Sequence, residues 1–201
     1  MPLQFNRKLR SQRLRKLAAQ LDLTYTLNDE WGIQQRLGDF RLFRRTWGSR
    51  LHHLMTKEDQ LLESRIHIFD YRYLRYGGKG RRKRVTQTVF FLDSRRLGLA
   101  EFYMRPENFF HKIGEALGLT EDIDFAEYKG FSDNYRLTSP HEGFVRTQFN
   151  DEILRFFTIE KGWSMEGMGY YLLLYKHGKV LDAKTIKRFY AKGMAVYEAF
   201  A

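Results

Sequence analysis

The chain has 201 residues, of which 43% are hydrophobic and 16% aromatic, enough to bury the core of one ordinary domain. It contains no cysteine, so disulfides, thiolate nucleophiles and cysteine-based zinc or iron–sulfur sites are excluded. No apolar stretch has the length of a signal peptide or a membrane span. The sequence therefore predicts a cytoplasmic protein, at most peripheral at a membrane.

The positive charge is concentrated in two short segments that hold no acid. The formal net charge of +11 equals the number of cations in residues 7–16 and 79–84 together. These cations are Arg7, Lys8, Arg10, Arg13, Arg15, Lys16, Lys79, Arg81, Arg82, Lys83 and Arg84. Charge concentrated in this way makes local positive potentials that attract the phosphates of nucleic acid or of lipid headgroups.

In the N-terminal part of the sequence, two helices are expected first and a strand after them. Apolar residues at helical spacing, with cations on the other side, predict a basic amphipathic helix over residues 1–22 that docks its leucines on the core. A short helix is expected through Trp31, Ile33 and Leu37, and a strand over residues 40–47. Residues 48–63 combine helical spacing with an exposed turn pattern, so their structure stays open.

A long hairpin is the clearest signal in the chain. Residues 65–76 and 85–93 are rich in β-branched and aromatic side chains and flank the Gly-rich basic loop 77–84. Apolar residues of both parities indicate that the first strand is covered on both faces. Because the loop joins two strands instead of leading into a helix, it does not fit a nucleotide-binding P-loop. A third strand is expected over residues 97–104.

The C-terminal half predicts shorter elements. Pro106 is expected in the first turn of a helix that buries Phe109, Phe110, Ile113 and Leu117. The further elements are short strands at 123–125 and 135–137, one bent helix or two abutting helices over 141–161, a hairpin of 163–168 with 170–176, and a final helix capped by Asp182.

These elements predict one α+β domain over residues 1–201. Its sheet is mainly antiparallel, with two hairpins and additional short strands, and helices pack on it, including amphipathic helices at both ends. No internal repeat divides the chain, and no stretch is long enough to be a linker.

Few polar residues are placed to carry chemistry. Glu107 and His111 lie four apart on a predicted helix with Arg105 just before it, which fits either an acid–base pair or a helix-surface contact. Asp70 and Arg72 share one strand face, where they could pair. The six histidines lack metal-site spacing, so neither a metal nor a cofactor is expected.

A series of short patches resembles a group of uncharacterised bacterial proteins. The patches are FDYRY (69–73), QTV (87–89), MRPE (104–107), DIDF (122–125), FS (131–132) and GWSMEG (162–167). The resemblance spans most of residues 12–200 and implies no activity for this chain. Some members of the group look as though they carry membrane-spanning segments ahead of this domain.

The sequence supports three hypotheses about function. The leading one is a non-enzymatic cytoplasmic binding domain whose two basic segments, with Arg105, contact a polyanion, either nucleic acid or an anionic membrane surface. The second is an enzyme that acts on a small anionic substrate near Arg105, Glu107 and His111, with Asp70 as a further candidate. The third is a protein–protein interaction module that uses aromatic-rich edge strands.

Overall fold

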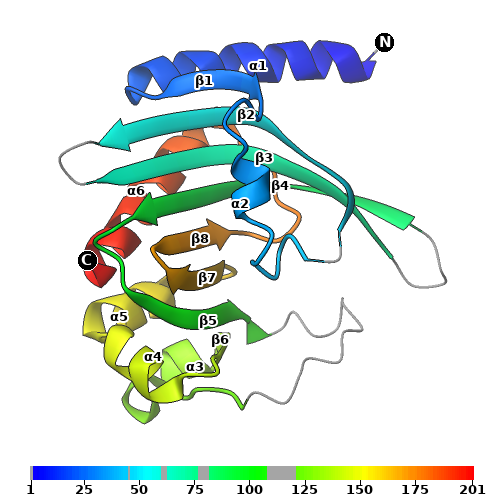
Figure 1. Ribbon diagram of the computed structural model, residues 1–201. Coiled ribbons are helices and arrows are strands. Elements are labelled where there is room, and N and C mark those ends of the chain that lie inside the picture. Colours follow the sequence, from blue (N-terminus) through cyan, green and yellow to red (C-terminus); the bar gives the residue numbers. More distant parts are fainter. Residues whose placement is uncertain (1, 45, 60–62, 77–81, 108–120) are drawn as a thin grey trace.

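In the described part of the chain, eight antiparallel strands form one sheet, in the spatial order β1-β2-β3-β4-β8-β7-β5-β6 (Figure 1). The computed structural model describes residues 2–44, 46–59, 63–76, 82–107 and 121–201. The strands are β1 (Thr24–Asn28), β2 (Trp47–Asp59), β3 (Ser64–Tyr76), β4 (Arg82–Ser94), β5 (Leu99–Pro106), β6 (Tyr135–Thr138), β7 (Ser164–Gly169) and β8 (Tyr171–Tyr175). The helices are α1 (Pro2–Gln20), α2 (Ile33–Arg36), α3 (Lys129–Ser132), α4 (Glu142–Gln148), α5 (Asp151–Ile159) and α6 (Ala183–Phe200). The predicted α+β fold with an antiparallel sheet is confirmed.

The hairpin of β3 and β4 forms the centre of the sheet. Its register runs without a shift from Ser64 at one end to Tyr76 at the hairpin end. Successive side chains of a strand alternate between the two faces. Ile68 therefore enters the core beneath the helices, whereas Phe69 enters a second core on the opposite face. The strand is buried on both faces, as its apolar residues of both parities predict.

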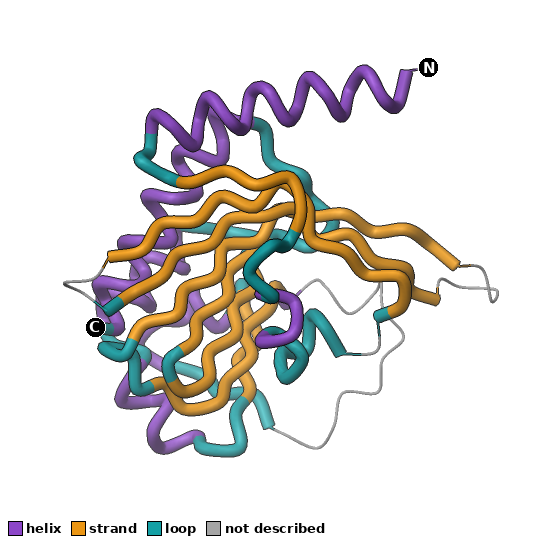
Figure 2. The backbone as a smooth tube through the Cα atoms, turned by 45° about the horizontal axis from the view of Figure 1, so that its top comes forward, coloured by secondary structure: helices purple, strands orange, loops and turns teal. Residues whose placement is uncertain are grey.

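α1 and α6 pack on the same face of the sheet (Figures 1 and 2). The residues that they bury there include Leu14, Leu17 and Ala18 of α1 and Ile186, Phe189, Val196 and Tyr197 of α6. Gly193 lets α6 approach β4 closely, because a Cβ atom there would lie 2.5 Å from the ring of Phe90. At the start of α6, the Asp182 carboxylate accepts a hydrogen bond from the Thr185 N–H at 2.8 Å, which is the predicted cap.

The predicted strand over residues 40–47 is wrong. The chain forms turns there, in which the Phe43 N–H donates to the Phe40 carbonyl oxygen at 3.0 Å, and β2 begins only at Trp47. The apolar pattern has another cause: Phe40, Leu42 and Phe43 fill the second core from a turn segment.

β2 accounts for most of residues 48–63, whose structure the sequence leaves open. A bulge after His52 contains His53 at a positive φ of 55°. The bulge places Leu51 and Leu54, three residues apart, in the same core. That spacing looks helical in the sequence although the backbone is a strand.

Two predictions for the chain from Pro106 onward need correction. Pro106 is the last residue of β5 and pairs with β6, so it does not lie in the first turn of a helix; Glu107 after it is in a 3₁₀ turn, and the residues that the predicted helix would bury lie outside the described residues. Residues 123–125 form no strand. The Ile123 N–H reaches the Leu137 carbonyl oxygen at 2.8 Å, but the Leu137 N–H is taken by the Asp122 carboxylate at 2.9 Å, so the ladder ends there.

The remaining C-terminal elements lie close to their predicted positions. Residues 141–161 form two abutting helices, α4 and α5, which is the second of the two alternatives. β7 pairs with β8 across the turn at Gly169, which has a positive φ of 56°. None of the helices that the structure describes has the length and apolarity needed to cross a bilayer.

Candidate anion-binding surface

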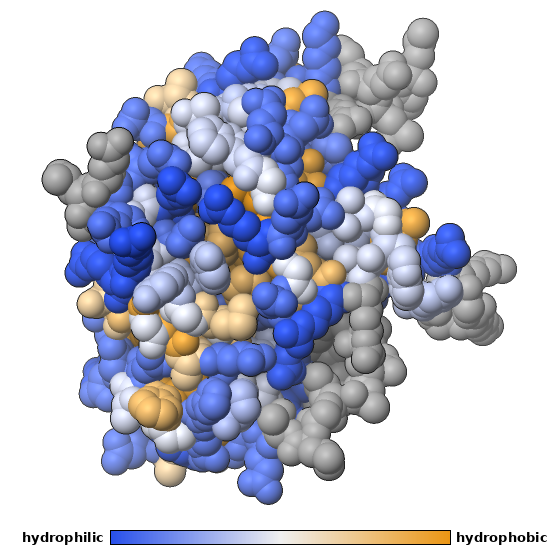
Figure 3. Space-filling view, in the orientation of Figure 1, coloured by the Kyte–Doolittle hydropathy of each residue, from blue (hydrophilic) through white to orange (hydrophobic). Residues whose placement is uncertain are grey.

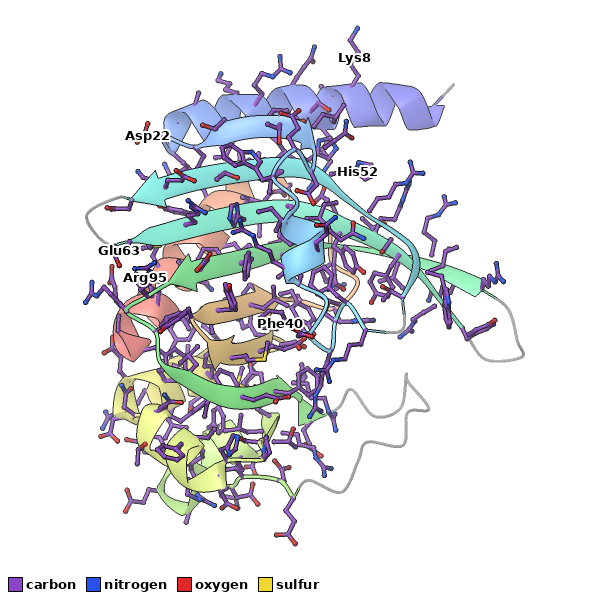
Figure 4. All side chains as sticks on the ribbon, in the orientation of Figure 1. Lys8, Asp22, Phe40, His52, Glu63 and Arg95 are labelled. Atoms are coloured by element: carbon purple, nitrogen blue, oxygen red, sulfur yellow. The ribbon has the colours of Figure 1, made fainter. Side chains whose placement is uncertain are left out.

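α1 turns a row of cations away from the sheet. Because its apolar side faces the core, Lys8, Arg13 and Lys16 are exposed, and Lys8 points outward in Figure 4. Arg15 is also exposed, with its guanidinium 5.5 Å from the centre of the Tyr25 ring. Among the residues that the structure describes, no carboxylate forms an ion pair with these four cations.

Arg10 differs from its neighbours because it points inward. Its Nε and Nη2 atoms donate to the two carboxylate oxygens of Asp70 at 2.6 and 2.7 Å, and Nη1 donates to the Leu181 carbonyl oxygen at 2.8 Å. The Thr88 hydroxyl donates to the same carboxylate at 2.9 Å. A bidentate pair of this kind is strong and geometrically specific. Arg10 therefore positions α1 on the sheet and does not contact an external polyanion, contrary to its predicted role.

The second basic segment continues the hairpin of β3 and β4, which extends beyond the body of the sheet (Figure 1). Residues 82–84 are three exposed cations at the start of β4. No ion pair involving them occurs within the described part of the chain. Lys79, Arg81 and the side chain of Arg7 lie outside the described residues.

An exposed aromatic pair lies at the loop end of this hairpin. Trp47 and Tyr76 are 52% and 60% exposed, and their ring centroids lie 5.1 Å apart with an angle of 77° between the planes. Tyr76 pairs with Arg82 across the hairpin, so the aromatic pair borders the three cations. Amphipathic rings beside cations are typical of surfaces that meet lipid headgroups or nucleic-acid bases.

The two basic segments leave the same end of the sheet. Both views place the N-terminal end of α1 and the β3–β4 hairpin at that end, with β1 and β2 between them (Figures 1 and 2). Figure 3 shows hydrophilic side chains over α1 and at the described loop end of the hairpin. We call the exposed cations Lys8, Arg13 and Lys16 of α1, together with Arg82, Lys83 and Arg84 of β4, the cationic surface.

The opposite end of the sheet has a different charge pattern. A groove of about 560 Å³ opens there, beside the Ser64 end of β3. Its charged lining residues are Glu58, Asp59, Glu63, Asp93, Arg65 and Arg95. Arg65 lies 2.9 Å from the Glu58 carboxylate and Arg95 lies 3.7 Å from that of Glu63. Acids thus gather at the end of the sheet that is distant from the hairpin.

Asp70 and Arg105, two of the residues named for an enzyme site, do not converge. Asp70 points to the face covered by α1, where its bidentate partner is Arg10, whereas the sequence suggested Arg72. Met104 belongs to the core on that face, so Arg105, the next residue of β5, points to the opposite face. Three strands, β4, β8 and β7, separate β3 from β5. Asp70 and Arg105 therefore do not line one pocket.

Arg105 is also no open binding residue. Only 3% of it is exposed, and burial lowers its pKa. The Glu107 N–H donates to the Asn134 carbonyl oxygen at 3.0 Å, and His111 lies outside the described residues. Within the described ranges, no group of three or more His, Asp or Glu residues is arranged to hold a metal ion.

A buried carboxylate that the sequence patterns did not reveal lies on the face opposite α1 and α6. Glu166 accepts hydrogen bonds from the N–H groups of Arg41 (2.6 Å) and Leu42 (3.2 Å) and from the Tyr175 hydroxyl (3.0 Å). Burial raises the pKa of Glu166 to about 7. Its position, a single acid in the strand sequence SMEGMG, was the available signal. Glu166 holds the turns before β2 against the sheet.

Comparison with known proteins gives the fold alone. No family model matches the chain, and no curated protein matches it. Among solved structures, the mycobacterial trehalose monomycolate transport factor A, TtfA, is similar, with a TM-score of 0.62 over 94% of this chain and 91% of that one. The sequences are 11% identical. This chain therefore shares its architecture with a transport factor at a low level of sequence identity.

Proposed function

We propose that this chain is a non-enzymatic protein that binds the surface of anionic lipid membranes through its cationic surface. One observation carries the proposal: six exposed cations on α1 and β4 have no carboxylate partner among the described residues, while acids gather at the other end of the sheet. Each Lys or Arg near an anionic bilayer contributes about 1 kcal/mol of attraction. Six such residues are enough for reversible peripheral binding.

The aromatic pair favours a membrane over nucleic acid as the anionic partner. Trp47 and Tyr76 contact each other edge to face, whereas base stacking uses open ring faces. Tryptophan and tyrosine are enriched at the headgroup level of bilayers, and here they border the three cations of β4. The chain shares its fold with a trehalose monomycolate transport factor, and a membrane partner for this chain is consistent with that likeness. The charge pattern, however, is the main support.

Co-sedimentation with vesicles tests the proposal. The variant Arg82→Gln, Lys83→Gln, Arg84→Gln removes the described cations of the hairpin, all of which are exposed. At about 1 kcal/mol each, their loss should weaken binding to vesicles of phosphatidylglycerol and phosphatidylcholine on the order of 100-fold. Pure phosphatidylcholine vesicles should bind neither protein.

A matched variant controls for net charge. Lys129→Gln, Arg155→Gln, Lys161→Gln removes the same three charges from exposed positions near α3 and α5 and should bind vesicles like the wild type. Equal losses in the two triple variants would show that only net charge matters and would contradict the proposed surface. Binding of the wild type to RNA or DNA oligonucleotides but not to anionic vesicles would show that the anionic partner is nucleic acid and not a membrane.

A further inference from the structure

α6 carries a second row of cations that the sequence does not present as a basic run. Lys184, Lys187 and Arg188 are exposed, at positions i, i+3 and i+4 of the helix. Residues with this spacing lie on one helix face. Ile186 and Phe189, between and beside them, are buried in the core. The first half of α6 is therefore cationic on its outer side and apolar on its inner side.

This row is fixed relative to α1. Arg10 of α1 donates to the Leu181 carbonyl oxygen, which lies just before α6, at 2.8 Å. The same guanidinium pairs with Asp70 of β3, so one side chain ties both helices to the sheet. Figures 1 and 2 show α1 and α6 on the same face of the sheet. Their outer sides together form one part of the surface of that face, and α3, α4 and α5 cover another part.

Acids are scarce on this part of the surface. Between Lys179 and Arg188 the only acid is Asp182, and its carboxylate accepts the Thr185 N–H as the cap of α6. No ion pair of Lys179, Lys187 or Arg188 occurs in the ranges that the structure describes. Val180, beside Lys179, is 45% exposed and adds an apolar side chain to the surface.

We infer that the contact with the anionic bilayer extends from α1 onto the first half of α6, so that the part of the helix-covered face formed by these two helices, and not the part formed by α3, α4 and α5, faces the membrane. This inference rests on the proposed function and adds the orientation of the bound protein. Two adjacent helices with outward cations offer a broad surface to a planar array of phosphates, and the charge complementarity identifies anionic lipid as the occupant. An anionic bilayer would repel the acids that line the groove at the opposite end of the sheet.

The first test removes the row. Lys184→Gln, Lys187→Gln, Arg188→Gln should weaken binding to phosphatidylglycerol-containing vesicles by about 10- to 100-fold, with the triple variant at Lys129, Arg155 and Lys161 as the control for net charge. All substituted side chains are exposed, so the thermal unfolding curve of each variant should match that of the wild type.

The second test reads the orientation directly. Because the chain has no cysteine, a single one can be introduced and labelled with a polarity-sensitive fluorophore. Ala191 is exposed on α6, three residues after Arg188, whereas Ala126 is exposed near α3. Anionic vesicles should shift the emission of the label in Ala191→Cys to the blue and leave that in Ala126→Cys unchanged.

The outcomes separate the inference from the proposed function. If the wild type binds vesicles, the hairpin variant loses binding, and neither the α6 variant nor the label at position 191 responds, the orientation is wrong and the proposed function stands. If the wild type does not bind anionic vesicles, both are wrong.

Discussion

The two faces of the sheet each bury a carboxylate, and each carboxylate fixes a segment distant in sequence by different chemistry. On the helix-covered face, Asp70 accepts a bidentate pair from the Arg10 guanidinium, 60 residues away. On the other face, Glu166 accepts two backbone N–H groups and a tyrosine hydroxyl, with no bidentate cation. The attachment of α1 therefore depends on a compensated charge, whereas the attachment of the turns before β2 depends on neutral donors and is sensitive to pH.

The largest expected effect comes from removing the charge that compensates Arg10. Asp70→Asn leaves the Arg10 guanidinium facing an amide at a site where the acid is only 7% exposed. Loss of one partner of a buried pair costs about 3 kcal/mol or more, so the free energy of unfolding in urea should fall by about that amount. Arg65→Gln, which breaks the exposed pair with Glu58, should cost less than about 1 kcal/mol. Equal costs would contradict the special role of Arg10.

On the other face of the sheet, stability should depend on pH because Glu166 titrates there. The pKa of Glu166 is raised from 4.5 to about 7 in the folded protein, so its contribution is fully present below pH 4.5 and is lost as the pH rises through 7. A shift of this size corresponds to about 3 kcal/mol. Glu166→Gln removes the titration. Relative to the wild type, the variant should therefore gain about 3 kcal/mol between pH 4 and pH 8, measured by urea unfolding at each pH. A constant difference would contradict the raised pKa.

A buried histidine on the same face titrates with the opposite sign. Burial lowers the pKa of His67 from 6.5 to about 4, so its contribution is present above pH 6.5 and is lost as the pH falls through 4. Between about pH 4.5 and 6.5 the two groups offset each other in the wild type. As the pH is raised through this range, the free energy of unfolding of Glu166→Gln should therefore increase. His67→Gln in the same background should remove that rise.

The smallest effect concerns the cap of α6. Asp182→Ala should lower the free energy of unfolding by about 1 kcal/mol, because the Thr185 N–H loses its partner. Asn150→Ala, which uncaps α5 at Ile153, should cost a similar amount and serves as the control. Only Asp182→Ala also removes an acid from the inferred membrane contact, so it should bind anionic vesicles about 5-fold more tightly despite its lower stability.

Sequence patterns predict the central hairpin well because both of its strands are long and rich in β-branched and aromatic residues. They leave residues 48–63 undecided, because the bulge at His53 in β2 changes the spacing of the buried residues. They are wrong at residues 40–47, where apolar side chains fill the second core from turns. The spacing of apolar residues in the sequence does not show whether a helix, a strand or a turn brings each side chain into the core.

The candidate site, too, is predictable from the sequence only in part. The two acid-free segments are evident in the sequence, and their exposed cations follow from the helical and strand patterns. That Arg10 points inward depends on contacts with Asp70 and Leu181, 60 and 171 residues away, which no local pattern contains. The cations of α6 were detectable, because positions i, i+3 and i+4 share a helix face, but a search for uninterrupted basic runs passes over them.

The most direct measurement is the affinity of the wild-type protein for phosphatidylglycerol-containing vesicles as a function of sodium chloride concentration. If the cationic surface binds the membrane, affinity is highest at low salt and falls steeply as salt screens the contact, while phosphatidylcholine vesicles bind nothing. Binding that is absent at low salt, insensitive to salt or equal on the two kinds of vesicle would contradict the account.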